Sequence, residues 1–374
     1  MANPKTHLPK IIVRKANEQT MKLKRTLPAL LLIVILSACG QEIAPANPTP
    51  VVAEAADQLP VQMDAEITPS PMPFQFVLPA PGAEPISGWR PPLYPIPWAM
   101  SPYDHFYFAR PIAADQVNWP IPDYRYGGIF FAPNIVHTGV DIPTPEGTPI
   151  MAAGPGTVVW AGWGLFTESP LNKEDPYGLA VAIRHDFSYN NQQLYTVYAH
   201  MSEVIAMVSQ HVETGELIGL VGSTGATTGP HVHFEVRFPT NSFQNTVNPE
   251  LWISPPQGWG VLVGRVTDTK DKTLQQVEVT VRSEETDESN IVKSYGGGGA
   301  INADPYYNEN LVLGDLAAGI YKISLKYDGK TRQTWVEIFP GQVTYFTFQG
   351  DNGFGTERPA TPKLDSLPKL TPTP

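Results

Sequence analysis

A short alternating run between Gly222 and Val236 places the strongest constraint on how this chain folds. Successive side chains of a β-strand point to opposite faces. Valine and phenylalanine alternate here with His231, His233 and Glu235, so the apolar residues predict a core-facing side. We therefore expect a strand that presents both imidazoles on an open polar surface, one to bind a metal and one to reach a substrate. Two solvated histidines on a half-exposed strand are the alternative.

Two upstream motifs supply further groups for a metal site. The first contains His137, Gly139 and Asp141, and the second places His200 two residues after Tyr198. Two histidines and a carboxylate are a usual ligand set for catalytic zinc, which leaves a fourth position for water. In an extended strand the two ends of H-x-G-x-D would lie about 13 Å apart, too far for ligand bonds of about 2 Å. We therefore expect the chain to turn at the glycine.

Taken together, these motifs resemble the lysostaphin-like zinc metallopeptidases, which are peptidoglycan endopeptidases. The resemblance covers roughly residues 98–253 and extends to four more segments: YRYGG, GTPIMAAGPGTVVWAG, YGLAVAIRHD and GELIGLVGSTG. It departs at Ser209-Gln210-His211, where relatives place a glycine turn, and this departure affects a loop rather than the metal set.

The resemblance implies roles for five residues. His137, Asp141 and His233 would bind one Zn²⁺ per chain, and His200 and His231 would be the catalytic histidines. In such a site zinc lowers the pKa of water and polarises the scissile carbonyl. One histidine would take the proton, and the other would stabilise the oxyanion or protonate the leaving amine. The sequence leaves open which histidine has which role.

Other polar residues near these motifs have less defined roles. Glu235 either orients an imidazole from behind the metal site or forms a surface ion pair. The remaining histidines outside the leader belong to no ligand pattern, and we expect a structural or solvated role for them: His105, His185 and His211.

The start of the chain has the features of an export signal. A basic segment precedes the apolar run LPALLLIVIL at positions 27–36, which is shorter than the roughly 20 residues that span a bilayer. The run ends in Leu36-Ser37-Ala38-Cys39, which resembles a bacterial lipobox, so we expect lipidation of Cys39 and anchoring in the cell envelope. A free cysteine beside an ordinary cleavage site is the alternative. The start codon (Met1 or Met21) and the membrane that holds the anchor stay open.

The distribution of proline along the chain distinguishes disordered segments from folded ones. The 40 prolines cluster outside the folded parts, and they predict a disordered tether at 39–85 after a leader at 1–38, and a disordered tail at 351–374. In polyproline conformation the tether would reach beyond about 100 Å. The net charge of -11 argues against nucleic acid as a partner, and the single cysteine excludes an intramolecular disulfide.

Short apolar runs between glycines and prolines predict an all-β chain with two folded domains. Residues 86–256 are expected to form an antiparallel β-sheet domain of the groove-type metallopeptidase kind, with MSEVIAM after His200 as one or two helical turns. Residues 257–350, called the C-terminal region below, predict a seven-stranded β-sandwich that resembles prealbumin-like, carboxypeptidase-regulatory-like modules. Every metal or proton-transfer candidate precedes residue 250. We therefore expect the C-terminal region to act in location or substrate engagement; alternatively, it packs against the groove and completes it.

Three function classes follow from the sequence. We expect a membrane-anchored zinc metalloendopeptidase, a monomer, that cuts the peptide stems or cross-bridges of bacterial peptidoglycan during wall remodelling or lysis. The alternatives are a non-catalytic relative that binds the wall or activates another wall hydrolase, and a protease that acts on proteins. Non-catalytic relatives typically lose ligands, whereas this chain keeps all five motif residues. The bond that is cut is not visible in the sequence.

Overall fold

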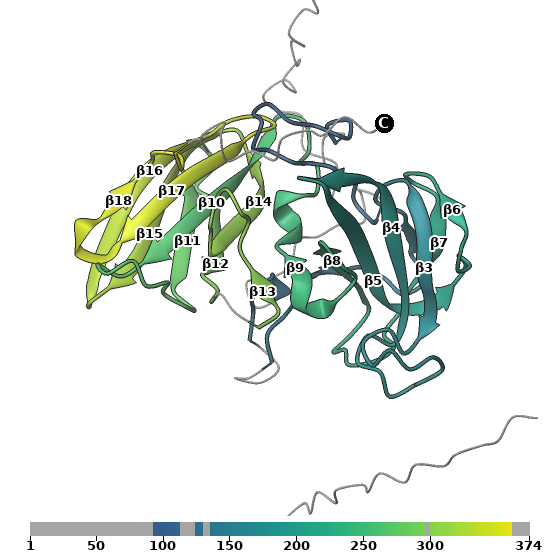
Figure 1. Cartoon of the computed structure of the whole chain (residues 1–374). Helices are drawn as coiled ribbons and strands as arrows, with labels where there is room; N and C mark the ends of the chain where they lie inside the picture. Colours follow the sequence, from purple (N-terminus) through teal and green to yellow (C-terminus); the bar gives the residue numbers. More distant parts are fainter. Residues whose placement is uncertain (1–92, 113–123, 130–134, 297–298, 361–374) are drawn as a thin grey trace, which may run out of the picture. The chain divides into compact units, whose positions relative to one another are not determined.

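The computed structural model describes residues 93–112, 124–129, 135–296 and 299–360 (Figure 1). Across these ranges the chain forms β-strands and a few 3₁₀ turns, with no α-helix, which confirms the all-β prediction. These residues contain no helix that is long and apolar enough to cross a membrane. The leader, the tether, Cys39 and the end of the chain from residue 361 lie outside the described residues.

A ten-stranded sheet carries the three histidine motifs. Its main path runs in the order β13-β9-β8-β5-β4-β3-β6, and β1, β2 and β7 pair beside it. The strands of this sheet are β1 (Val140–Pro143), β2 (Pro149–Met151), β3 (Gly156–Trp163), β4 (Leu179–Tyr189), β5 (Gln192–Val204), β6 (His211–Val212), β7 (Leu217–Val221), β8 (His231–Arg237), β9 (Thr246–Val247) and β13 (Ile301–Asn302). Two 3₁₀ turns, η3 (Phe243–Asn245) and η4 (Pro249–Leu251), follow β8.

Strand β8 lies in the interior of this sheet. It pairs with β1 and β5 along its length and with β9 near its end. Its apolar residues Val232, Phe234 and Val236 join the main hydrophobic core, as the alternation predicts. The expectation of an open polar surface is wrong, because His231, His233, Glu235 and Arg237 are also buried.

The predicted helical turns after His200 do not form. Strand β5 continues to Val204, and the backbone N–H groups of Ile205 and Ala206 both donate to the carbonyl of Ile218. MSEVIAM forms these hydrogen bonds with a neighbouring segment of the same chain instead of a helix. The sheet satisfies backbone groups that an isolated helical turn would leave unpaired.

The C-terminal region forms two four-stranded sheets. Their orders are β14-β10-β17-β18 and β12-β11-β15-β16. The strands are β10 (Trp259–Thr267), β11 (Glu278–Ser283), β12 (Ser289–Lys293), β14 (Leu311–Ala317), β15 (Gly319–Tyr327), β16 (Lys330–Ile338), β17 (Val343–Gln349) and β18 (Phe354–Gly355), with η5 (Gly350–Asn352) before the last. All seven predicted runs become strands. The short β18 lies beyond residue 350, in the segment predicted as a disordered tail, and it pairs with β17, so the ordered chain continues past the predicted boundary. One apolar cluster that includes Leu262, Val279, Ile323 and Phe346 draws on both sheets.

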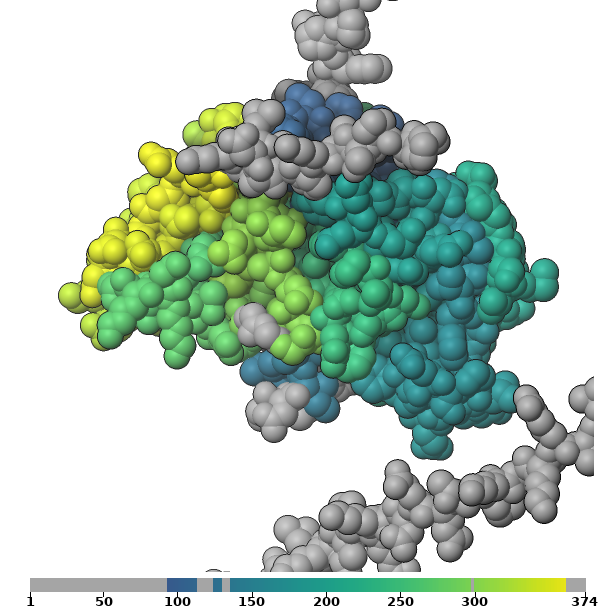
Figure 2. Space-filling model, viewed as in Figure 1, coloured from purple at the N-terminus to yellow at the C-terminus, as the bar shows by residue number. Residues whose placement is uncertain are grey.

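The two groups of strands belong to one compact unit. Strand β13 leaves the C-terminal region to pair in parallel with β9 of the large sheet. In the space-filling view the lime-green atoms near β13 lie against the green atoms that follow β8 (Figure 2). The main core also includes Val261, Val312 and Tyr345 from the C-terminal region. The domain boundary at 256/257 remains a prediction, but the residues on its two sides pack together.

Candidate metal centre

Strands β1 and β8 bring the three predicted ligands together. Their antiparallel register places Asp141 directly opposite His233. The Oδ1 atom of Asp141 lies 2.8 Å from Nε2 of His137 and 2.8 Å from Nδ1 of His233, and those two nitrogens are 3.0 Å apart. One ligand atom from each residue falls within a 4.8 Å cluster, and all three side chains are buried.

Gly139 permits this convergence by its small size. The backbone bends at Gly139, as the spacing of the motif predicts, but its φ is not in the left-handed region. A Cβ atom at this position would overlap the carbonyl oxygen of Phe234 and lie 2.9 Å from Cε1 of His233. The motif therefore needs glycine because β8 passes too close for a side chain.

The hydrogen bonds on the far side of each ring aim lone pairs into the cluster. The Nδ1 atom of His137 lies 3.0 Å from the carbonyl oxygen of Arg125, and Nε2 of His233 lies 2.9 Å from Oε1 of Glu235. A ring nitrogen that donates to an oxygen leaves the other nitrogen as an acceptor. Two such nitrogens and the Asp141 carboxylate would then be three acceptors around one point, an arrangement that requires a positive charge.

The electrostatics of the site agree with that requirement. Burial alone would lower the pKa of His233, but its hydrogen bonds to Asp141 and Glu235 raise the pKa to about 9. Burial would raise the pKa of Asp141, and His137 and His233 instead hold it well below its usual value. A proton on His233 thus supplies the charge that a bound cation would otherwise supply, and metal binding would release it.

The donor set fits zinc. Two atoms that each lie about 2 Å from a tetrahedral ion are about 3.3 Å apart. The separations of 2.8, 2.8 and 3.0 Å differ from this value by only a few tenths of an ångström. His137, Asp141 and His233 could therefore hold the ion after a small outward shift, and their role as ligands remains a prediction.

Glu235 lies behind the cluster and orients His233. Its side chain is fully buried, so the alternative of a surface ion pair is wrong. Besides His233, its carboxylate accepts hydrogen bonds from Arg237 Nε at 2.6 Å and from the Tyr177 hydroxyl at 2.7 Å. Burial raises the pKa of Glu235, but Arg237 and His233 lower it to about 2. An ionised Glu235 fixes the tautomer and the orientation of the ring in front of it.

His200 and His231 lie together beside the three ligands. Their ring centroids are 4.8 Å apart, and Nε2 of His231 is 3.4 Å from Oδ2 of Asp141. The Nδ1 atom of His200 lies 2.8 Å from the carbonyl of Thr224, and that of His231 lies 2.8 Å from the carbonyl of Gly229. Both rings therefore direct Nε2 away from these backbone contacts, in the tautomer that can accept a proton there.

The backbone at His200 is unusual for a residue with a side chain. Its φ is 64°, in the left-handed region. At this residue β5 changes partners, since Ala199 pairs with β8 and Met201 pairs with β7. The hydrogen bond from the His200 N–H to the carbonyl of Tyr177 holds this turn of the strand. Strained backbone of this kind clusters at functional sites.

Burial keeps both of these histidines neutral. It lowers the pKa of His200 to about 3, and the neighbouring His233 and His231 act in the same direction. Burial also lowers the pKa of His231, against the attraction of Asp141. Both imidazoles are therefore in the basic form at neutral pH, as a proton acceptor requires.

The other three histidines lie outside the cluster. His105 and His185 are buried, and each has a ring nitrogen within hydrogen-bond distance of a core oxygen. His211 is half exposed and pairs with Asp186.

Several residues of the site had no role assigned from the sequence, although YRYGG contains Arg125 and YGLAVAIRHD begins at Tyr177. Arg125 acts through a backbone carbonyl, which no residue pattern reveals. Tyr177 reaches Glu235 from a position 58 residues earlier in the chain, and Thr138 donates to the same carboxylate. Arg237 shares the strand face of Glu235, so alternation alone could have indicated this pair.

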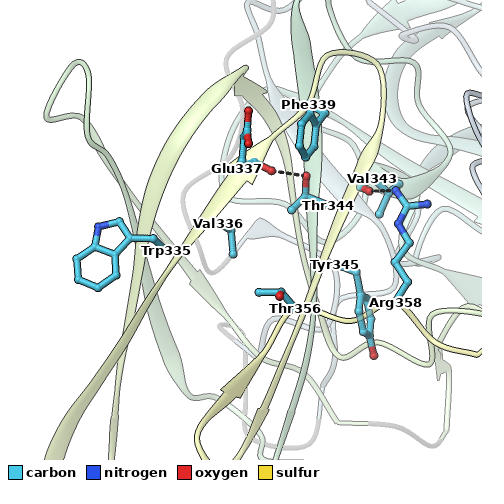
Figure 3. Close-up of a pocket in the computed structure, with 9 residues that line it drawn as sticks. All are labelled: Trp335, Val336, Glu337, Phe339, Val343, Thr344, Tyr345, Thr356 and Arg358. Atoms are coloured by element: carbon cyan, nitrogen blue, oxygen red, sulfur yellow. Dashed lines mark hydrogen bonds between the residues drawn. The ribbon is translucent and has the colours of Figure 1, made fainter.

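A cavity of about 340 Å³ in the C-terminal region is a separate feature (Figure 3). None of the five predicted site residues lines it. Its lining residues are Trp335, Val336, Glu337, Phe339, Val343, Thr344, Tyr345, Thr356 and Arg358. In the close-up the Trp335 ring extends away from the other side chains (Figure 3).

Comparisons with known proteins find relatives that match part of this chain. The DD-carboxypeptidase/endopeptidase Mpg of Neisseria meningitidis is 39% identical over 102 residues, which are 27% of this chain and 20% of that protein. The peptidoglycan DD-endopeptidase ShyA of Vibrio cholerae is 37% identical over 101 residues, with coverage of 27% and 20%. The chain thus spans about a fifth of the length of these curated relatives.

A solved structure and a family model also match this chain. The A109H mutant of the catalytic domain of the prophage-encoded M23 protein EnpA from Enterococcus faecalis is 31% identical. The match covers 38% of this chain and 95% of that one, with a TM-score of 0.29. The model of Peptidase family M23 matches residues 135–249, which contain all five predicted site residues. Residues 135–249 of this chain are therefore a peptidase family M23 domain.

Proposed function

We propose that this protein is a zinc metalloendopeptidase that hydrolyses peptide cross-links of bacterial peptidoglycan. One observation carries the proposal: His137, Asp141 and His233 direct three ligand atoms at one buried point, beside two further imidazoles. The names of its relatives, a DD-carboxypeptidase/endopeptidase and a peptidoglycan DD-endopeptidase, support the substrate class. All five motif residues are present and close together, which favours an enzyme over a non-catalytic relative.

The residues of the site have separate roles in the proposed reaction. When bound, zinc supplies a Lewis acid for the scissile carbonyl and lowers the pKa of water. His200 and His231, both neutral, offer Nε2 atoms that accept a proton and later return it to the leaving amine. Their Nδ1 atoms stay bonded to backbone carbonyls, which keeps the rings in position through the proton transfers. Glu235 keeps the ring of His233 aligned while charge develops.

Digestion of purified cell walls tests this function. We expect the full-length protein to release fragments from sacculi by cutting peptide bonds, because the site combines a metal with proton acceptors. Incubation of sacculi with different cross-link types, followed by mass spectrometry, would identify the bond. A zinc chelator should stop the release, and added Zn²⁺ should restore it.

Two parallel assays separate the alternatives. Casein serves as a substrate that lacks wall cross-links, so cleavage of casein without release from sacculi would indicate a protease of proteins. A protein that binds sacculi and cuts neither substrate would contradict the enzymatic proposal.

We also propose that lipid on Cys39 anchors the protein in the cell envelope, because an apolar run ends in Leu36-Ser37-Ala38-Cys39. Dual acylation holds a protein stably where a single chain binds marginally. Cys39→Ser is therefore expected to move the protein to the soluble fraction or to leave its precursor uncleaved, as seen by cell fractionation and intact mass. Gln41→Ala is the control. Membrane association and processing of Cys39→Ser at wild-type levels would rule out the lipid anchor.

A further inference from the structure

A short segment from Arg125 to Gly128 holds the metal ligand His137 in place. The N–H of Gly127 donates to the carbonyl of His137 at 2.8 Å, and the N–H of His137 donates to the carbonyl of Gly128 at 2.8 Å. The His137 ring itself lies 3.0 Å, through Nδ1, from the carbonyl oxygen of Arg125. The position and the tautomer of this ligand therefore depend on the backbone of the Arg125–Gly128 segment.

The C-terminal region supports the middle of this segment through aromatic packing. The rings of Tyr126 and Tyr295 meet edge to face, with centroids 5.3 Å apart. Together with Ile301 they form a buried apolar cluster of their own. The hydroxyl of Tyr126 accepts from the N–H of Asn302 at 2.9 Å and donates to the carbonyl of Thr246 at 2.7 Å. Tyr126 is thus enclosed on three sides: by Tyr295, which follows β12, by strand β13, and by strand β9.

Gly127 is in direct contact with the same region. Its φ is +78°, and a Cβ atom there would overlap the Cβ of Tyr295. The side-chain amide of Gln276 donates to the carbonyl of Gly127 at 3.3 Å. Gly127, which donates a hydrogen bond to the His137 backbone, therefore packs against Tyr295 and accepts a hydrogen bond from Gln276.

Arg125 is tied to the C-terminal region through a shared carboxylate. Its guanidinium forms a buried ion pair with Glu250. The same Oε2 atom of Glu250 accepts from the N–H of Gly314 in β14 at 2.7 Å. Three consecutive residues of the segment, 125–127, thus each have a contact that leads into the C-terminal region.

We propose that the C-terminal region is a working part of the metal site, with Tyr295 and Gln276 as positioning residues for His137. The inference rests on the proposed function, since it takes His137 as a metal ligand. Groups that orient a ligand from behind typically change metal affinity by about 10- to 100-fold when they are lost. This region contains no histidine or cysteine, yet its contacts support the sequence-based alternative in which it packs against the site and completes it.

Metal titration of full-length variants tests the inference. Tyr295→Ala is expected to weaken Zn²⁺ binding by about tenfold or more, measured by competition with a chromophoric chelator, and to alter the visible spectrum of bound Co²⁺. Gln276→Asn shortens the side chain and introduces a residue type that tolerates the left-handed φ of 56° found there. This variant should weaken Zn²⁺ binding by a few fold. It tests the same inference if Tyr295→Ala does not fold.

Two controls separate positioning from general destabilisation. Tyr295→Phe keeps the ring against Gly127 and loses the hydrogen bond to Glu309, so we expect metal affinity within about twofold of wild type. Tyr321→Ala removes another buried tyrosine, from the core between the two C-terminal sheets, and should also leave affinity unchanged.

The results separate this inference from the proposed function. Folded Tyr295→Ala and Gln276→Asn proteins with wild-type affinity and Co²⁺ spectrum would overturn the positioning role alone. An equal loss of affinity in Tyr321→Ala would also overturn it, because destabilisation would then explain the effect. Failure of the wild-type protein itself to bind zinc would instead contradict the proposed function on which the inference rests.

Discussion

Asp141→Ala is expected to abolish metal binding and peptide hydrolysis together. Asp141 provides the only carboxylate in the cluster of ligand atoms, and its Oδ1 atom lies 2.8 Å from both ligand nitrogens. Its removal leaves two imidazoles without the charge that balances a dication. The loss of affinity should exceed the 10- to 100-fold that is typical of groups behind a ligand. His137→Ala and His233→Ala should have the same phenotype.

Metal analysis of the purified variants, together with hydrolysis rates, measures this effect. Asp186→Ala is the matched control, because Asp186 is a half-exposed carboxylate that pairs with His211 away from the cluster. It should retain both metal and activity. Loss of metal in His231→Ala, with retention in His233→Ala, would reverse the assignment of ligand and catalytic histidines.

His200→Ala and His231→Ala are expected to retain zinc near one per chain while kcat/KM falls by about 100-fold or more, the usual size of a lost acid or base. The physical reason is that neither Nε2 atom belongs to the three-atom ligand cluster. Burial keeps both imidazoles neutral, so each variant removes a proton acceptor rather than a charge.

The same preparations that give zinc content should be assayed for rate, so that metal loss and lost proton transfer are distinguished. His211→Ala, at a half-exposed ring outside the cluster, should match the wild-type protein. Wild-type rates in both His200→Ala and His231→Ala would show that neither histidine takes part in proton transfer.

The site motifs were predictable from the sequence because they depend on short-range geometry. Side chains alternate along any strand, so His231 and His233 had to share a face whatever surrounds them. The bend at Gly139 follows from the distance between His137 and Asp141, which an extended chain cannot close. The register that sets Asp141 opposite His233 brings two of these motifs together, and no local pattern specifies it.

The interior of the large sheet was mispredicted because burial depends on the whole chain. Alternation distinguishes two faces but does not show what covers the polar one. Tyr177 covers the polar face from 58 residues earlier in the chain, and its hydroxyl and Arg237 both donate hydrogen bonds to the buried Glu235. Polar groups that form hydrogen bonds with one another can lie inside a protein, which is why an apparently exposed face became buried.

From the sequence alone we predicted the all-β class, the seven strand-forming runs of the C-terminal region, and the five candidate histidine and aspartate residues of the site, whose roles remain predictions. Each of these follows from residue type and period within a few positions. Only the tertiary structure decided that Gln276 and Tyr295 support the backbone beside His137. Gln276 lies 149 positions after Gly127 in the chain. The contact forms where two packed surfaces meet, and no local pattern in either segment predicts it.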